Sequence, residues 1–135
     1  MKDRFRFRVW EPSKKEMHYE DFVVTATGYI APIDDHYDAY CCFDQTNFET
    51  DKNCIAMQCT GLKDKNGKLI FEGDIVKIFH LSSSGQPISF IGEVKYYQEQ
   101  CYWGIKNDGA FATFLDTDDV FEVIGNIYDN KELME

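Results

Sequence analysis

The chain has little leucine and no long apolar run, and both absences narrow the class of protein. Scarce leucine is unfavourable for a helical bundle. No stretch approaches the roughly 20 apolar residues that a membrane-spanning helix needs. At the N-terminus, charged side chains stand where an export signal would place its apolar segment, namely Lys2, Asp3, Arg4, Arg6 and Arg8. We therefore expect a soluble cytoplasmic protein with no membrane partner.

The sequence is also poor in positive charge, with 14 Lys and Arg against 24 Asp and Glu and a net charge of -10. Phosphates and anionic lipids favour a basic surface, so we expect no general affinity for nucleic acid or membranes. The charge is uneven, however. Residues 1–18 hold six basic and three acidic side chains, a local charge of +3 that leaves -13 for the remainder.

The number and spacing of the cysteines do not match a disulfide-bonded protein. The five cysteines are an odd number without regular spacing, which argues against a disulfide scaffold and favours reduced thiols. A length of 135 residues indicates one compact unit with one hydrophobic core. Aromatic residues are plentiful, with 11 Phe, 8 Tyr and 2 Trp, and they favour β-strands packed into a small mainly β fold.

The N-terminal segment alternates with a period of two, which predicts a half-buried strand over residues 4–10. One face would carry Arg4, Arg6, Arg8 and Trp10, and the other Phe5, Phe7 and Val9. After a turn at Pro12, residues 17–19 can return as a partner strand, so we expect an N-terminal β-hairpin.

The rest of the chain reads as short strands separated by turns. Residues 22–33 suit a strand broken at Gly28 and closed by Pro32, whereas residues 34–53 show no period and are expected to be irregular, with at most a short helix. Two turn signals follow, Asn66-Gly67 and Glu72-Gly73-Asp74. A loop is expected over residues 81–87, strands over 90–97, 101–106, 111–114 and 120–128, and a short terminal helix from an Asp129 cap through Glu132. Five or six strands within residues 57–128 satisfy the count for a small barrel.

Three separate blocks together resemble the YopX family of bacteriophage and prophage proteins, whose function is uncharacterised. The blocks are FRVWEPSKKEMHY (7–19), TGLKDKNGKLIFEGDIVKI (60–78) and FEVIGNIYDNKEL (121–133), with GEVKYY and CYWGIK between the last two. The resemblance implies a mainly β fold with an SH3-like small barrel at its C-terminal end. Within a single domain of residues 1–135, we expect a hairpin and irregular part over 1–53 and the barrel with a short helix over 54–135. The bacterial host's cytoplasm is the implied location, and the resemblance supplies no catalytic residues.

Several groupings could carry chemistry, but their spacing does not favour it. For metal binding, the adjacent Cys41 and Cys42 chelate one ion poorly, and Cys54 and Cys59 differ by an odd number, so a strand would separate them. This candidate set also includes His36, Asp34, Asp35 and Asp38. A Cys/His nucleophile involving His18, His36 or His80 has no local signature. The run Asp116, Asp118 and Asp119 fails as a calcium loop, because its sixth and twelfth positions are Phe121 and Ile127. We therefore expect no catalytic residue, metal or other cofactor.

Two surface features remain. A face of Arg4, Arg6, Arg8 and Trp10 suits phosphate, carboxylate or stacking contacts, although it is also an ordinary polar strand face. In CYWGIK, alternation places one of Tyr102 and Trp103 in the core. The resulting hypothesis is a non-enzymatic protein-interaction or self-assembling module, with a protein partner or another copy of the chain. The alternatives are nucleic-acid binding through the arginine face, and a Cys/His or metal-dependent enzyme.

Overall fold

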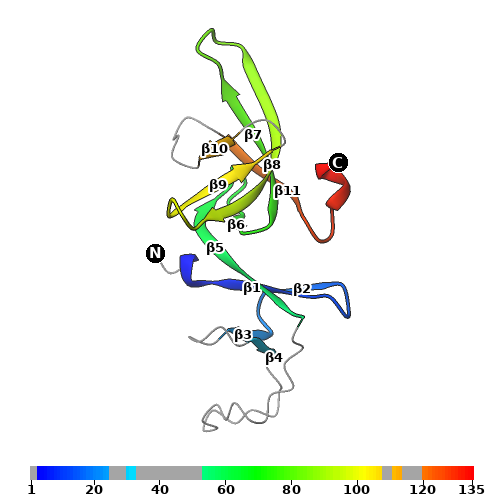
Figure 1. Ribbon diagram of the computed structural model, residues 1–135. Coiled ribbons are helices and arrows are strands. Elements are labelled where there is room, and N and C mark those ends of the chain that lie inside the picture. The colour runs from blue at the N-terminus through cyan, green and yellow to red at the C-terminus, as the bar shows by residue number, and fades with distance from the viewer. Residues whose placement is uncertain (1–2, 25–29, 33–52, 108–110, 114–119) are drawn as a thin grey trace. The chain divides into compact units, whose positions relative to one another are not determined.

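The computed structural model describes residues 3–24, 30–32, 53–107, 111–113 and 120–135, which form a mainly β protein (Figure 1). Its residues divide into two compact units, the first made of residues 1–6 and 58–135 and the second of residues 7–57. The first six residues thus belong to the same unit as the C-terminal part of the chain. No helix in these described parts is long and apolar enough to cross a membrane.

In the second unit, the expected N-terminal hairpin is confirmed. Strand β1 (Phe7–Glu11) pairs antiparallel with β2 (Glu16–His18), with Glu11 opposite Glu16 and Val9 opposite His18. A second small hairpin joins β3 (Phe22–Val24) to β4 (Ile30–Pro32), which divides the predicted strand of residues 22–33 into two paired strands. The predicted irregular segment of residues 34–53 lies outside the described residues except for Asn53.

The arginine face predicted from alternation over residues 4–10 is wrong. Strand β1 begins only at Phe7, because Asp3–Phe5 forms a 3-10 turn that the Arg6 N–H closes on the Asp3 carbonyl at 3.0 Å. Within β1, both Arg8 and Trp10 are buried, and so is Val9 on the opposite face. A strand covered on both faces does not sort its residues into an inner and an outer set, which is the pattern the prediction assumed.

The first unit contains a five-stranded antiparallel sheet in the order β10-β9-β8-β7-β11, which curls into a half-barrel. Its strands are β7 (Asp74–Leu81), β8 (Pro87–Tyr97), β9 (Tyr102–Lys106), β10 (Phe111–Thr113) and β11 (Val120–Asn126). The hairpin of β5 (Ile55–Lys63) and β6 (Leu69–Phe71) adds Ile70 to the core. The buried core residues are Ile70, Val76, Ile78, Val94 and Ile105.

The two predicted turns are confirmed, and one aspartate stabilises each of them. In the first, Gly67 adopts φ 79°, and the Asp64 side chain accepts the backbone N–H groups of Asn66 and Lys68 at 2.9 Å each. In the second, Gly73 has φ 81° and Asp74 accepts the Phe71 N–H at 2.8 Å. Positive φ explains why glycine stands at both positions, because a Cβ atom is disfavoured there.

Three details of the secondary structure differ from the sequence prediction. Strands β7 and β8 run further than expected, so the loop of residues 81–87 shortens to a turn at residues 82–86. A bulge between Val123 and Gly125 breaks the alternation predicted for the last strand. The terminal helix is a 3-10 helix over Lys131–Met134, and Asp129 does not cap it but accepts a hydrogen bond from the Asn126 side chain.

Candidate functional site

The end of the β7–β8 hairpin exposes hydrophobic side chains, and Figure 1 shows this hairpin extending beyond the other strands of its sheet. Antiparallel partners share a face, so the register places one set of side chains on the surface opposite the Ile78 core face. We call this set the outer face. It consists of Lys77, Phe79, Leu81, Pro87, Ser89 and Ile91.

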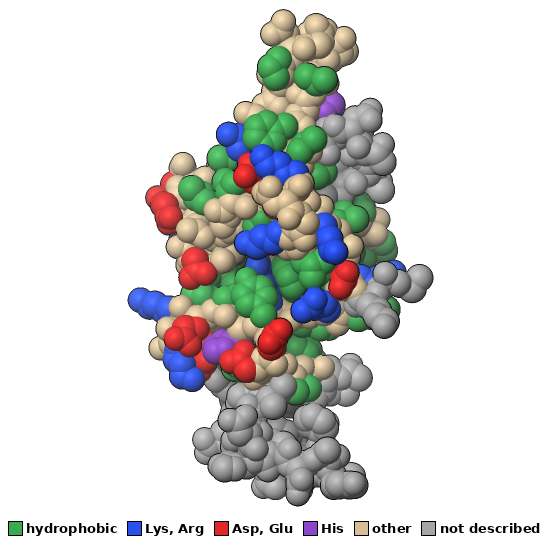
Figure 2. Space-filling model, turned by 180° about the vertical axis from the view of Figure 1, so that it is seen from behind, with side chains coloured by type: hydrophobic (Ala, Val, Ile, Leu, Met, Phe, Trp, Pro, Cys, Tyr) green, Lys and Arg blue, Asp and Glu red, His purple; other side chains and the backbone are tan. Residues whose placement is uncertain are grey.

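The outer face carries large hydrophobic side chains that are exposed to solvent. Leu81 is 67% exposed and Phe79 is 36% exposed, while Ile88, on the reverse side of the hairpin tip, is 46% exposed. Figure 2 shows hydrophobic side chains at this tip. Single exposed apolar residues are ordinary, but adjacent ones on a projecting element are typical of a surface that another molecule covers.

Two lysines border the aromatic ring of this face. The Nζ atoms of Lys65 and Lys77 each lie 5.2 Å from the centroid of Phe79, within the range of cation–π attraction. Lys65 also forms an ion pair with Glu122 at 3.0 Å. In a protein with a net charge of -10, the outer face thus combines apolar area with a local positive charge.

A cavity of about 480 Å³ continues the outer face toward the C-terminus. Lys77, Ser89 and Ile91 belong both to the face and to the cavity wall. Asn107 is held at this wall, because its side-chain amide donates to the Ile91 carbonyl at 2.6 Å. The C-terminal 3-10 helix supplies the other side through Leu133 and Met134, together with Glu135 that follows it. An extended segment on the hairpin could therefore continue into a concave site.

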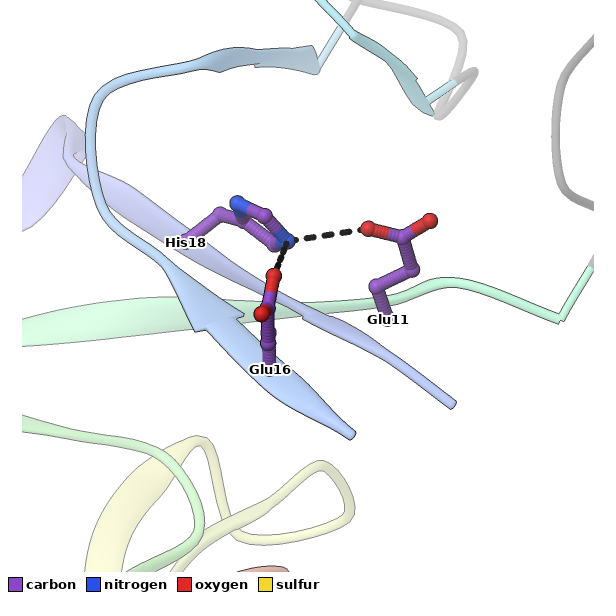
Figure 3. Close-up of side chains that lie close together, drawn as sticks. All are labelled: Glu11, Glu16 and His18. Carbon is purple, nitrogen blue, oxygen red and sulfur yellow. Dashed lines mark hydrogen bonds and ion pairs between the residues drawn. The ribbon is translucent and has the colours of Figure 1, made fainter. Parts of the chain in front are cut away.

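A second group of polar side chains lies in the other unit, on the β1–β2 hairpin. Glu16 and His18 are two residues apart on β2 and share a face, and Glu11 is the cross-strand partner of Glu16. The His18 Nε2 atom lies 3.0 Å from Glu11 Oε2 and 3.9 Å from Glu16 Oε2 (Figure 3). The His18 ring nitrogen and one carboxylate oxygen from each of the two glutamates all lie within 4.8 Å of one another. We call Glu11, Glu16 and His18 the hairpin triad.

Neighbouring groups hold the triad in place. On the other ring nitrogen, His18 Nδ1 lies 2.7 Å from Asp21 Oδ2. Partial burial opposes ionisation of Asp21, but the hydrogen bond and charge of His18, together with hydrogen bonds from the backbone at Asp21 and Glu20, outweigh it and hold the pKa of Asp21 below its usual value. Glu11 is buried, and its Oε1 atom contacts Lys14 Nζ at 3.2 Å and the Ser13 hydroxyl at 3.3 Å. Oε2 of Glu11 is thereby left facing His18.

Only two of the four residues of the predicted interaction face are exposed. Arg4 and Arg6 are exposed and belong to the first unit, whereas Arg8 and Trp10 are buried in the second. Binding by Arg4 and Arg6 stays a prediction. The prediction that one aromatic of CYWGIK is core is confirmed, since Trp103 packs on the core cluster.

The alternative of a Cys/His nucleophile gains little support from the described residues. Cys59 is fully buried, and its thiol donates to the Ile70 carbonyl at 3.6 Å. Burial is the main cause that raises the pKa of Cys59, which keeps the thiol protonated and weakly nucleophilic. The ring nitrogens of His18 contact carboxylates. Cys41, Cys42 and His36 lie outside the described residues, as do Asp116, Asp118 and Asp119.

Sequence reasoning missed both the outer face and the hairpin triad. The triad had one local signal, Glu16 and His18 at strand spacing, but Glu11 joins them only through the register of the hairpin. The outer face had the alternation of Phe79 and Leu81, which the expected loop at residue 81 concealed.

Comparisons with known proteins agree with this architecture. The crystal structure of the protein YopX from Bacillus subtilis is similar, with a TM-score of 0.58, 25% identity, and coverage of 96% of this chain and 95% of that one. A crystal structure of a protein from Enterococcus faecalis has a TM-score of 0.52 and 28% identity over 96% and 97% of the two chains. No curated protein matches. The sequence profile described as YopX protein matches residues 6–135, and the chain therefore belongs to the YopX family.

Proposed function

We propose that this protein is a non-enzymatic protein-interaction module, and that the outer face of the β7–β8 hairpin is its binding surface. The observation that carries the proposal is the exposure of Leu81 and Phe79 on an element that extends beyond the core. Covering apolar surface contributes about 25 cal/mol per Å². Hydrocarbon side chains bind a partner well but supply no general acid, base or nucleophile.

The chemistry of the face favours a particular partner. Lys65 and Lys77 stand beside Phe79, so a bound segment that places carboxylates near an apolar side chain gains both hydrophobic and electrostatic contacts. The adjoining cavity can receive a further side chain of the same segment. We therefore assign the face to an apolar, acidic segment of another protein.

A second copy of the chain is a less suitable occupant. Each chain carries a net charge of -10, and two such chains repel each other at moderate ionic strength. A different protein that carries a short acidic segment avoids most of this repulsion. The free thiols of Cys59 and Cys101 suit a reducing compartment, and we place the interaction in the bacterial cytoplasm.

The test is selection from a random peptide library on the immobilised full chain, followed by titration of the enriched peptides. We expect peptides that combine Asp or Glu with a large apolar residue. Leu81→Ser should weaken their binding about tenfold, which corresponds to the loss of one buried leucine contact. Lys77→Glu should weaken peptide binding more at low salt than at high salt, because salt screens exposed charges.

The matched control is Leu62→Ser, which removes an exposed leucine of β5 that is 43% exposed and lies outside the outer face. It should leave peptide affinity unchanged. Equal binding by the Leu81→Ser variant, or enrichment of peptides without acidic residues, would refute the proposal. Light scattering adds a separate outcome, since a dimer that Leu81→Ser dissociates would identify a second copy as the occupant.

A further inference from the structure

We propose that the hairpin triad of Glu11, Glu16 and His18 binds a divalent transition-metal ion, with Zn²⁺ as the preferred ion. This site belongs to the β1–β2 hairpin and is independent of the outer face and its partner. The triad offers one imidazole nitrogen and two carboxylate oxygens, which are established ligand types for zinc.

The contacts of the His18 ring show which of its nitrogens can bind a metal ion. An ionised carboxylate only accepts hydrogen bonds, so the 2.7 Å contact with Asp21 Oδ2 requires that His18 Nδ1 carries a proton. In a neutral ring, Nε2 then presents its lone pair to Glu11 Oε2 at 3.0 Å. Two lone pairs at this distance repel each other. A divalent cation between Nε2 and Oε2 removes this repulsion, because it binds both lone pairs.

The third ligand atom of the triad also suits a metal ion. Glu16 Oε2 lies 3.9 Å from Nε2, which is too far for a hydrogen bond to the ring but within reach of an ion bound at Nε2. A metal ion uses all three atoms. Zinc bonds of about 2.1 Å in tetrahedral geometry set neighbouring ligand atoms about 3.4 Å apart, between the two observed separations.

The surroundings have the features of a metal centre. Asp21 on Nδ1 is a carboxylate–histidine arrangement, which fixes the ring and makes Nε2 a better ligand. Lys14 and Ser13 occupy Oε1 of Glu11, so that this carboxylate offers the single oxygen Oε2. Three protein ligands leave a fourth position for water or an outside ligand.

The register of the hairpin explains why these ligands converge. Glu16 and His18 follow each other at strand spacing, and the cross-strand pair Glu11 and Glu16 brings the third ligand from β1. A bound ion would join the ends of β1 and β2. Since Glu16 is the exposed ligand, with 60% of its side chain accessible, it can adjust to complete the site.

The test is calorimetric titration of the full chain with zinc chloride after chelator treatment. We expect one ion per chain. Glu16→Gln and His18→Gln should each weaken zinc binding at least about tenfold, and Asp21→Asn, as a positioning variant, about tenfold. Glu20→Gln is the matched control, because it removes an exposed carboxylate of the same segment that lies outside the triad. It should bind zinc as the wild type does.

Cobalt as a stand-in for zinc distinguishes the triad from the cysteines. The triad predicts a cobalt spectrum without a thiolate charge-transfer band. In the wild-type chain, zinc should also shift the ring resonances of His18 in NMR spectra, which keeps the test valid if a variant fails to fold. Zinc binding that survives Glu16→Gln and His18→Gln, a thiolate band, or no binding up to millimolar zinc would overturn the proposal.

Discussion

Asp64 is the residue at which one side chain joins two parts of the first unit, and its replacement by asparagine is the sharpest test of the fold. Its Oδ1 atom accepts the N–H groups of Asn66 and Lys68 at 2.9 Å each, within the β5–β6 turn. Its Oδ2 atom accepts the N–H of Val123 in β11 at 3.0 Å. The carboxylate therefore fixes the turn and also binds it to the sheet.

The expected loss of stability follows from these contacts. In Asp64→Asn, the amide oxygen can keep the two turn contacts, but the amide nitrogen then faces the Val123 N–H, so two donors meet. One unsatisfied buried donor and the lost charge-assisted bond together cost about 2–3 kcal/mol of unfolding free energy. Asp64→Ala loses all three contacts and should cost about 4 kcal/mol, a large part of the stability of a small domain.

The effect must also depend on pH. Burial opposes ionisation of Asp64, but the N–H groups of Val123, Lys68 and Asn66 outweigh it and hold its pKa below the usual 3.8. A depressed pKa means that the ionised group stabilises the folded state above pH 3.8, and that this contribution is lost as the pH falls through the folded-state value. The difference between wild type and Asp64→Asn should therefore shrink in acid.

The assay is urea unfolding followed by tryptophan fluorescence, at about pH 7 and about pH 3. Asp3→Asn is the matched control, since the Asp3 side chain is 40% accessible and its ion pair with Arg6 is 4.0 Å long. It should change stability by no more than about 0.5 kcal/mol. An Asp64→Asn variant that is as stable as the control at neutral pH, or that loses as much stability in acid as at neutral pH, would contradict this prediction.

Two further predictions concern glycine and cysteine. Gly92→Ala should lower the free energy of unfolding by about 2–3 kcal/mol, because its Cβ would lie 2.3 Å from Ile105 Cγ2. Gly85→Ala meets no atom within 4 Å and should lower it by only about 1 kcal/mol, through its positive φ. Thermal unfolding of both variants measures this difference, and equal losses of stability would contradict the prediction. In a maleimide labelling experiment on the folded protein, the exposed Cys101 should react fast, and the buried Cys59 should react only on unfolding. Comparable labelling rates would contradict this prediction, because they would show that the protein around Cys59 opens readily.

Local sequence signals predicted much of the architecture because they act within a few residues. Asn66-Gly67 and Gly73 place turns wherever the chain needs positive φ, and the structure has glycine at φ 79° and 81° there. The alternation of short β-branched and aromatic segments predicted the hairpins for the same reason, since side-chain direction on a strand depends only on its neighbours.

The tertiary structure alone decided which residues those strands bring together. Arg8 reads as exposed by alternation, yet it is buried because β1 is covered on both faces. Val123 meets Asp64 across 59 positions of the sequence, and no local pattern predicts that contact. The register of β1 and β2 likewise assembles the hairpin triad.

The sequence by itself thus determined the class of fold and the places where the chain turns, because backbone conformation responds to adjacent residues. Only the tertiary structure decided that hydrophobic side chains are exposed on the β7–β8 hairpin and that two carboxylates lie close to His18. Burial and the distances between side chains depend on segments far apart in the sequence. A chain with little positive charge and no long apolar run can for this reason still present an apolar face bordered by lysines.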